Sequence, residues 1–381
     1  MLRVLATSVL LIVGGLLTTA CGDDSAMSET GSGGSTVGSG SGQGTGGAGQ
    51  GGEAVMLPSW DLDFLGWMDE VIKNLPGQGS EGFEAPNSSQ RDDFRLACEA
   101  LRDGDLAEAK QRAQTVQYQL VAIVDEGAND AVFYALLPNS WSSQDTPALD
   151  GRGLFFVRAK QEVNKYLGLS APHPRFDSFS GLVATNAFRQ LEARSLAIAG
   201  AHRCANATLS GCSGTTAVCG SPAAPYRESD MAHMDRAFFQ VFHEVMDADG
   251  GGSIQHVQVH GFASGANDPE FTLSAGTSNN VADDNFTPNL LATKLAELTA
   301  LAGSQKPGNS CNQTGDINRL CGSTNTQGRY TNGVDAQQVC TTSSGGASDG
   351  RFVHAELSKA IRDINGSIGP QVFIDALSDV F

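Results

Sequence analysis

Two histidines and an aspartate stand at the ends of short apolar runs that are typical of buried strands. His173 and Asp177 follow one such run, and the prolines that flank His173 exclude a helix there. His260 ends another run, over residues 254–260, in which valines face one way and polar side chains the other. Imidazole nitrogens and a carboxylate oxygen suit zinc, and a catalytic zinc site commonly has three protein ligands plus a water. We therefore predict a zinc site at His173, Asp177 and His260; the alternative is a turn-forming aspartate beside ordinary loop and core histidines.

Two further strand ends carry groups that could take part in a reaction. Glu356 ends residues 352–356, where it could act as a general base for the attacking water. Alternatively, it is an exposed acid that begins the next helix. His202 and Arg203 follow a third run, and Arg203 could hold a substrate carboxylate while His202 stabilises an oxyanion. Both could instead pair with nearby acids.

These strand ends need one sheet edge to bring them together. The strand-like runs are 118–124, 131–137, 153–157, 166–170, 195–201, 254–260 and 351–356, and the helical ones are 60–75, 90–101, 106–116, 182–192, 231–246, 289–302 and 359 onwards. We expect the first three strands to form hairpins at one edge, and the later alternation of strand and helix to form parallel units. The prediction is an α/β domain over 118–381, with a mixed, largely parallel sheet and helices on both faces, preceded by a short helical segment over 56–117. In such sheets, ligands bind at the carboxyl ends of the strands.

Other polar groups receive structural interpretations. His233 and His243 lie in the apolar stripe of the expected helix over 231–246, which favours a core role. Asp230 could join a polar cluster at His233, although helix capping explains it equally well. Residues 247–254 resemble half of a calcium loop but lack ligands that the loop needs, so we interpret them as a turn. The sequence contains no phosphate-binding loop, dinucleotide-binding fingerprint or nucleophile elbow.

The first residues predict export. Residues 1–20 combine one arginine, an apolar run and small residues before Cys21, as a signal peptide does. This end resembles a bacterial lipoprotein cleavage site, so we expect lipid on Cys21 and anchoring in a membrane; ordinary secretion is the alternative. Residues 21–55 consist mostly of small and polar residues and predict a flexible Gly/Ser tether. The expected location is extracytoplasmic, either lipid-anchored in the bacterial cell envelope or secreted.

The cysteines agree with export. Seven of the eight cysteines lie after Cys21, and an exported protein is expected to form disulfide bonds from most of them. Cys98, on a helical stretch far from the others, is the expected free thiol. Two of Cys204, Cys212 and Cys219 are expected to pair with each other. Cysteine-ligated zinc is the competing interpretation, but no Cys-x-x-Cys motif occurs.

The net charge limits the partners. The formal charge of −18 argues against nucleic acid, whose phosphates need clustered Lys and Arg. It argues equally against electrostatic adhesion to anionic lipid. A small-molecule or peptide substrate remains the expected partner.

The order of these segments, over roughly the last 210 residues, resembles poly-gamma-glutamate hydrolases and N-formylglutamate amidohydrolases, which have a zinc-carboxypeptidase-like α/β fold. Residues 172–177 stand in place of the family's His-Gly-Gly-x-Ile-Glu motif, His260 precedes a glycine as the third zinc ligand does, and Glu356 matches the catalytic glutamate. The resemblance also implies Asn325 and Arg329 as substrate-binding residues. This sequence departs from the family in the first motif, where the glycines are replaced and the carboxylate is an aspartate one position early.

We therefore expect a secreted lipoprotein that hydrolyses amide bonds, of the peptide or gamma-glutamyl type, with zinc and a metal-activated water. Glu356, Arg203 and His202 are the expected catalytic residues. The alternatives are a non-catalytic surface lipoprotein that binds a ligand with the same fold, and a metal-dependent phosphoesterase.

Overall fold

A computed structural model describes residues 55–140, 151–220, 222–265, 267–314 and 319–381. Residues 57–381 form one compact unit. The predicted signal peptide, Cys21 and nearly all of the predicted tether lie outside the described residues, so these predictions remain untested. No helix in the described ranges is long and apolar enough to cross a membrane.

The unit is built on a ten-stranded sheet with the order β1-β2-β3-β4-β6-β5-β9-β12-β10-β11. Its strands are β1 (Ser59–Leu62), β2 (Tyr118–Asp125), β3 (Ala131–Pro138), β4 (Leu154–Val157), β5 (Lys165–Ala171), β6 (Ala193–Ile198), β9 (Gln255–Gly261), β10 (Phe271–Ser274), β11 (Asn309–Ser310) and β12 (Phe352–Leu357). A separate small sheet pairs β7 (Thr215–Thr216) with β8 (Ala224–Pro225).

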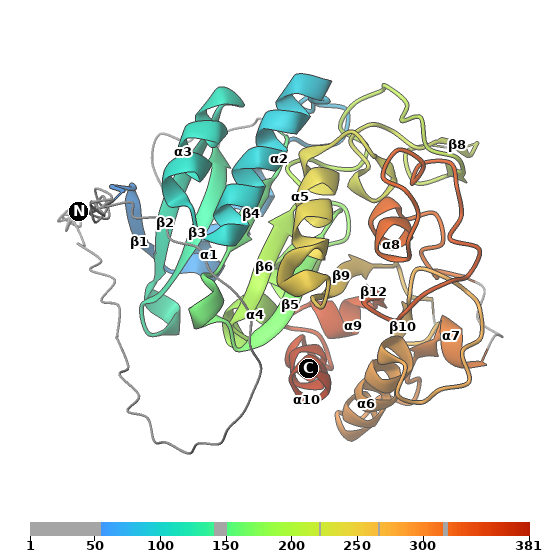
Figure 1. Ribbon diagram of the computed structural model, residues 1–381. Helices are drawn as coiled ribbons and strands as arrows, with labels where there is room; N and C mark the ends of the chain where they lie inside the picture. The colour runs from blue at the N-terminus through green and yellow to red at the C-terminus, as the bar shows by residue number, and fades with distance from the viewer. Residues whose placement is uncertain (1–54, 141–150, 221, 266, 315–318) are drawn as a thin grey trace, which may run out of the picture. The chain divides into compact units, whose positions relative to one another are not determined.

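The pairing divides the large sheet into regions. β2, β3, β4 and β6 pair antiparallel in that order, so the predicted hairpin strands are confirmed. β6, β5, β9 and β12 are neighbours and run parallel. The sheet is therefore mixed and mostly parallel, as the sequence predicts. These four central strands lie side by side (Figure 1), so their carboxyl ends share one edge of the sheet, and the expected site residues are at or just after these ends in the chain.

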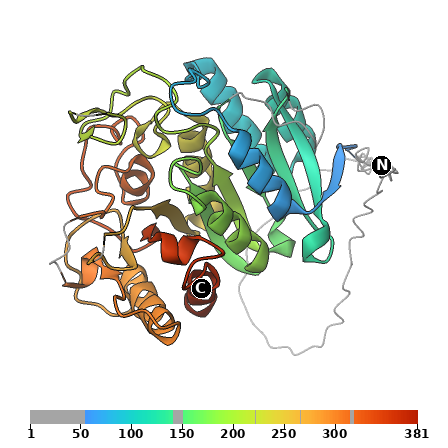
Figure 2. The same ribbon diagram turned by 180° about the vertical axis from the view of Figure 1, so that it is seen from behind.

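Helices cover both faces of the sheet. On one face lie α1 (Phe64–Asn74), α4 (Ser180–Gln190), α6 (Thr287–Leu301) and α10 (Gln371–Val380), and on the other lie α2 (Ser88–Asp103), α3 (Leu106–Thr115) and α5 (Phe238–Asp247). Figures 1 and 2 show the two helical layers from opposite sides. Successive side chains of β4 pack into the two hydrophobic cores on opposite faces of the sheet: Phe156 packs with Phe64 and Phe133, while its neighbour Phe155 packs with Phe94. Three short helices remain: α7 (Cys311–Thr314), α8 (Thr326–Thr331) and α9 (Lys359–Arg362).

Several predicted element boundaries are wrong. The helix expected from residue 60 begins at Phe64, because Trp60 and Leu62 alternate with exposed residues and form β1 beside β2. The helix expected from residue 90 begins at Ser88, where Asn87 is the N-cap and Gln90 completes a capping box. The helix expected over 231–246 begins only at Phe238, after a short 3-10 turn. β10 and β11 were not predicted, since such short strands give little periodic signal.

The cysteine predictions are confirmed. Cys204 and Cys219 form the local disulfide. The other bonds join Cys212 to Cys340 and Cys311 to Cys321. Cys98 is free and buried in the second core. Three disulfides in one domain are typical of a protein outside the reducing cytoplasm.

Candidate metal centre

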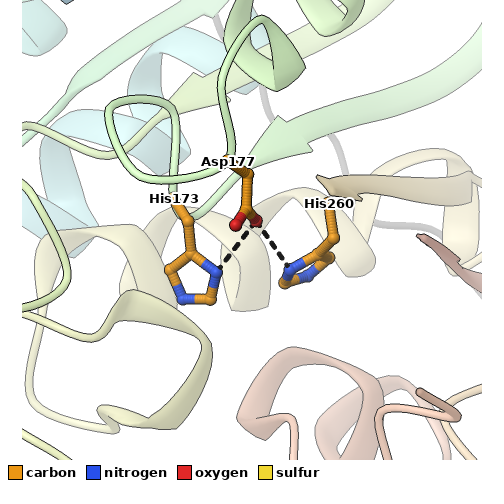
Figure 3. A group of neighbouring side chains, drawn as sticks. All are labelled: His173, Asp177 and His260. Atoms are coloured by element: carbon orange, nitrogen blue, oxygen red, sulfur yellow. Dashed lines mark hydrogen bonds and ion pairs between the residues drawn. The ribbon is translucent and has the colours of Figure 1, made fainter. Parts of the chain in front are cut away.

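The turn after β5 brings Asp177 back beside His173. The backbone N–H groups of Phe176 and Asp177 both donate to the carbonyl of His173, at 3.0 and 2.8 Å. Asp177 Oδ2 then lies 3.3 Å from His173 Nδ1 and 3.6 Å from Nδ1 of His260, at the end of β9. Figure 3 shows both imidazoles turned toward this one carboxylate. The three residues converge although β5 and β9 are far apart in sequence.

The spacing of these atoms suits a bound ion. Two ligand atoms of a tetrahedral zinc, each about 2.0–2.1 Å from the metal, lie about 3.3 Å apart. A direct N–H···O hydrogen bond is usually shorter, about 2.9–3.0 Å. His173, Asp177 and His260 are 1%, 4% and 3% exposed, so the ion would be shielded from bulk water. The group could hold a metal ion.

Each histidine is also held by its second nitrogen. His173 Nε2 lies 2.8 Å from Asp230 Oδ1, and His260 Nε2 lies 2.8 Å from Gln258 Oε1. An acceptor at Nε2 favours the tautomer with its proton on that nitrogen, so a metal ion bound beside Asp177 would meet the lone pair of Nδ1. Metal-binding histidines in proteins are usually fixed in this way. The second contacts therefore present both Nδ1 atoms as ligands.

Charge in the group favours a cation. Burial, together with the nearby His354, holds the pKa of His260 well below its usual value, so this ring is neutral. Burial alone would raise the pKa of Asp177, but the contacts with His173 and His260 outweigh it and lower that pKa. Burial and Arg203 act to lower the pKa of His173, yet Asp230 and Asp177 outweigh them and raise it. An ionised carboxylate and two imidazoles form a suitable donor set for zinc.

Asp230 is the centre of a buried ion cluster. Its Oδ1 also accepts from His233 Nδ1 at 3.0 Å, and its Oδ2 accepts from Arg203 Nε and Nη2 at 3.1 and 2.5 Å. Burial would raise the pKa of Asp230, but Arg203 and the two histidines hold it well below its usual value. Arg203 is therefore engaged by a carboxylate of the protein itself. This ion pair is the alternative that the sequence left open for Arg203, and its contact with a substrate stays a prediction.

Amide side chains support the other histidine. Gln258 Oε1 also accepts from Asn325, whose own Oδ1 caps α8 through the N–H of Gly328. Asn325 is 1% exposed, and its amide connects Gln258 to the start of α8. Arg329 lies further away, where its donors meet the carbonyls of Ser323, Val339 and Cys340. These two predicted substrate residues thus have structural partners.

Glu356 lies beside His260 in the sheet. The two residues are register partners on β12 and β9, as are His354 and Gln258. His354 Nε2 lies 3.3 Å from Glu356 Oε1, while Glu356 Oε2 is buried and has no hydrogen-bond partner in the described part of the chain. His260, His354 and Glu356 also place ligand atoms within 4.8 Å of one another. The glutamate is thus next to the candidate metal ligands and retains a free oxygen.

A pocket of about 460 Å³ lies beside the turn after β5. Its lining includes Pro174, Arg175 and Phe179 from this turn, Leu182 from α4, and His202. Burial lowers the pKa of His202, and its Nδ1 accepts from a backbone N–H at 3.0 Å. His202 thus borders the pocket as a neutral ring, and it does not join the three candidate ligands.

A tight contact explains the glycine after His260. A side chain at Gly261 would overlap the guanidinium of Arg362, which donates to the carbonyls of Leu357 and Phe262. Arg362 also donates to the carbonyl of Ser178. It therefore ties the ends of β9 and β12 to the turn that carries Asp177.

The sequence prediction missed Asp230, Gln258 and His354 as parts of this site. Their spacing offered a signal: Gln258 and His354 lie two residues from His260 and Glu356 on the same strand faces, and Asp230 lies three residues from His233. Other groups of side chains that could hold a metal ion occur in the described residues. One of them, Cys212–Asp235–Cys340, is not a thiolate site, because its cysteines form a disulfide.

Comparisons with known proteins add little. No protein-family model and no curated protein matches the chain. Among solved structures, it is similar to gene product Atu2144 from Agrobacterium tumefaciens, with 13% identity and a TM-score of 0.29, over 58% of this chain and 92% of that one. This likeness is too slight to indicate a function.

Proposed function

We propose that this chain is a zinc-dependent hydrolase of amide bonds, exported and anchored through lipid on Cys21. One observation carries the proposal: His173 Nδ1, His260 Nδ1 and Asp177 Oδ2 converge while each imidazole's Nε2 is fixed by an acceptor. Bound zinc would polarise the scissile carbonyl and activate water for attack. A preformed donor set of this kind, beside an acid, supports hydrolysis over a purely structural role.

In this proposal Glu356 moves the proton. Its free Oε2 accepts a proton from the attacking water, and the same group then gives that proton to the leaving amine. His354 holds the other oxygen in place from two residues away on β12. Burial of both side chains keeps the group away from bulk solvent, which strengthens its interaction with developing charge.

The substrate would lie against the pocket beside the turn after β5. Asp69, Lys73 and Arg175 line this pocket together with apolar side chains, and the basic groups suit an acyl group with an apolar stem and a carboxylate. Arg175 donates to the uncharged backbone carbonyls of Ile72 and Lys73, whereas Arg203 is paired with the charge of Asp230. Arg175 therefore replaces Arg203 as the proposed carboxylate partner. Peptides and gamma-glutamyl amides have the required chemistry, which is also what the family resemblance implies.

The experiment is a zinc measurement joined to an amide-substrate panel. Wild-type protein is expected to bind zinc and to release amine from at least one peptide or gamma-glutamyl amide. Glu356→Gln should keep the zinc and lose activity by about 10²–10⁴-fold, the usual contribution of a general base. His260→Ala should lose the metal at this site. Lys359→Ala is the matched control, since that side chain is 70% exposed one turn beyond β12.

The outcomes separate the alternatives. A folded protein that binds zinc but hydrolyses only phosphate esters would replace the proposal with a phosphoesterase. A protein that binds no metal at His173, Asp177 and His260 but does bind a ligand in the pocket would instead be a non-catalytic binding lipoprotein. Mass spectrometry of membrane-extracted protein tests the lipid on Cys21 separately.

A further inference from the structure

A second set of metal-binding side chains lies at the opposite end of β9 from His260. His243 and Asp247 are one turn apart on α5, and His256 faces them from the strand. Figure 1 shows α5 lying over the central strands of the sheet. One ligand atom of each residue lies within 4.8 Å of the others. His243 and His256 are 6% and 5% exposed, so this group is shielded from solvent.

One ring nitrogen of His256 has an ion-pair contact but no aligned hydrogen bond. Its Nε2 is buried and lies 3.3 Å from Asp247 Oδ1, close to the separation of two zinc ligands. A buried polar nitrogen usually has an aligned hydrogen bond, and water or an ion can take its place. The Nε2 of His256 and the carboxylate of Asp247 therefore face each other at a separation that suits a shared cation.

A small cavity lies beside the two histidines. Its volume is about 10 Å³, and its lining includes His243, His256, and Gly168 of β5. This is about the room that one water needs, and too little for a substrate. A side chain at Gly168 would collide with the His256 ring, so the glycine is what allows the ring to lie there.

The surrounding charges are compatible with a cation. Asp247 accepts from Thr331 Oγ1 at 2.8 Å and from Arg351 Nη1 at 3.0 Å. Metal-binding carboxylates usually accept such additional hydrogen bonds. Arg351 also pairs with Asp349 at 2.8 Å, so its charge is shared between two carboxylates.

We propose that His243, Asp247 and His256 form a second zinc site, which fixes α5 against β9 and has a structural role. Two imidazoles and a carboxylate are zinc ligands, and a water in the small cavity completes the coordination. The site shares no ligand with the candidate catalytic centre, so it does not depend on the proposed function.

Zinc counting on the full chain tests this proposal. After dialysis against chelator, reloading and gel filtration, elemental analysis should find one zinc at each site. His256→Ala should lose the second zinc and keep the first, and His260→Ala should do the reverse. Because His256 is buried, His243→Gln is a second variant, in which an amide can keep the hydrogen bond to Thr331 Oγ1. Gln255→Ala, which points to the other face of β9, is the matched control.

Thermal melting gives a readout that does not need activity. Added zinc should raise the melting temperature of His260→Ala, which keeps the second site, but not that of the double variants His256→Ala/His260→Ala and His243→Gln/His260→Ala, which keep neither site. Wild-type zinc content in both His243 and His256 variants would overturn the second site and leave the first untouched. Zinc lost from His256→Ala but fully retained in His260→Ala would support the second site and overturn the metal role of His260.

Discussion

Replacement of Asp230 by Asn should separate the stability of the ion cluster from metal binding. Asp230 is fully buried and accepts from His173, His233 and Arg203. Asn has nearly the same shape but no charge, and its single carbonyl oxygen cannot accept all four N–H groups. Arg203, which is 9% exposed, then lacks its counter-charge. Breaking such a buried ion pair costs about 3–5 kcal/mol, which we expect as the loss in free energy of unfolding.

The same substitution should weaken zinc binding through His173. Loss of an outer carboxylate from a metal-binding histidine typically lowers affinity by about 10–100-fold. The double variant Asp230→Asn/Arg203→Met removes both charges of the pair, so much of the lost stability should return. Zinc affinity should stay low in that variant, since His173 still lacks its carboxylate. Denaturant unfolding of the apo proteins and zinc titration against a competing chelator measure the two effects.

Two results would refute this reasoning. An Asp230→Asn protein with wild-type zinc affinity would show that Asp230 does not orient His173 for a metal. A loss of stability below about 1 kcal/mol, the range of exposed pairs, would show that the Arg203–Asp230 pair behaves as a surface contact.

Three further predictions concern the rest of the unit. Burial would raise the pKa of Asp249, but Arg194, 2.6 Å away, outweighs this effect and lowers the pKa. The pair therefore stabilises the fold above the unfolded pKa of about 3.9, and this stabilisation is lost as the pH falls through the lower folded pKa. Melting from pH 6 to 2 should therefore fall less steeply in Asp249→Asn, and an equal slope would contradict this. Burial raises the pKa of the Cys98 thiol well above its usual range, so alkylation should reach Cys98 only after unfolding; fast labelling of the native protein would contradict it. Gly261→Ala should displace Arg362 and lower the zinc affinity at His260, as measured by zinc titration. The double variant Gly261→Ala/Arg362→Ala removes the overlap, so its zinc affinity should partly recover.

Local patterns were sufficient for much of the fold. The period-2 runs at β2, β3 and β12, and the helical period at α2 and α3, appear in the sequence because side-chain direction follows backbone geometry directly. Prediction failed where two patterns overlapped, as at Trp60, whose spacing fits both a helix and the short strand β1. Parallel pairing in the sheet centre followed from the alternation of strand and helix.

The candidate site could also be predicted from the sequence only in part. His173, Asp177, His260 and Glu356 could be selected from sequence, because each lies at a strand end where parallel strands collect polar groups. Arg203 and Asn325 were selected too, but their roles depend on partners that are distant in the chain: Asp230 for one and Gln258 for the other. A local sequence pattern does not predict pairs between residues that are so far apart in the chain.

The sequence by itself determined which side chains could bind a cation, the strand and helix order that places them, and the cysteine content that suits an environment outside the cytoplasm. Only the tertiary structure decided which nitrogen of each histidine faces Asp177, which arginine is already neutralised, and which cysteines pair. The physical reason is the distance along the chain over which each effect acts. Side-chain direction within an element is fixed by neighbouring residues, whereas a hydrogen-bond acceptor or counter-charge is supplied by whichever distant segment the packed sheet brings alongside.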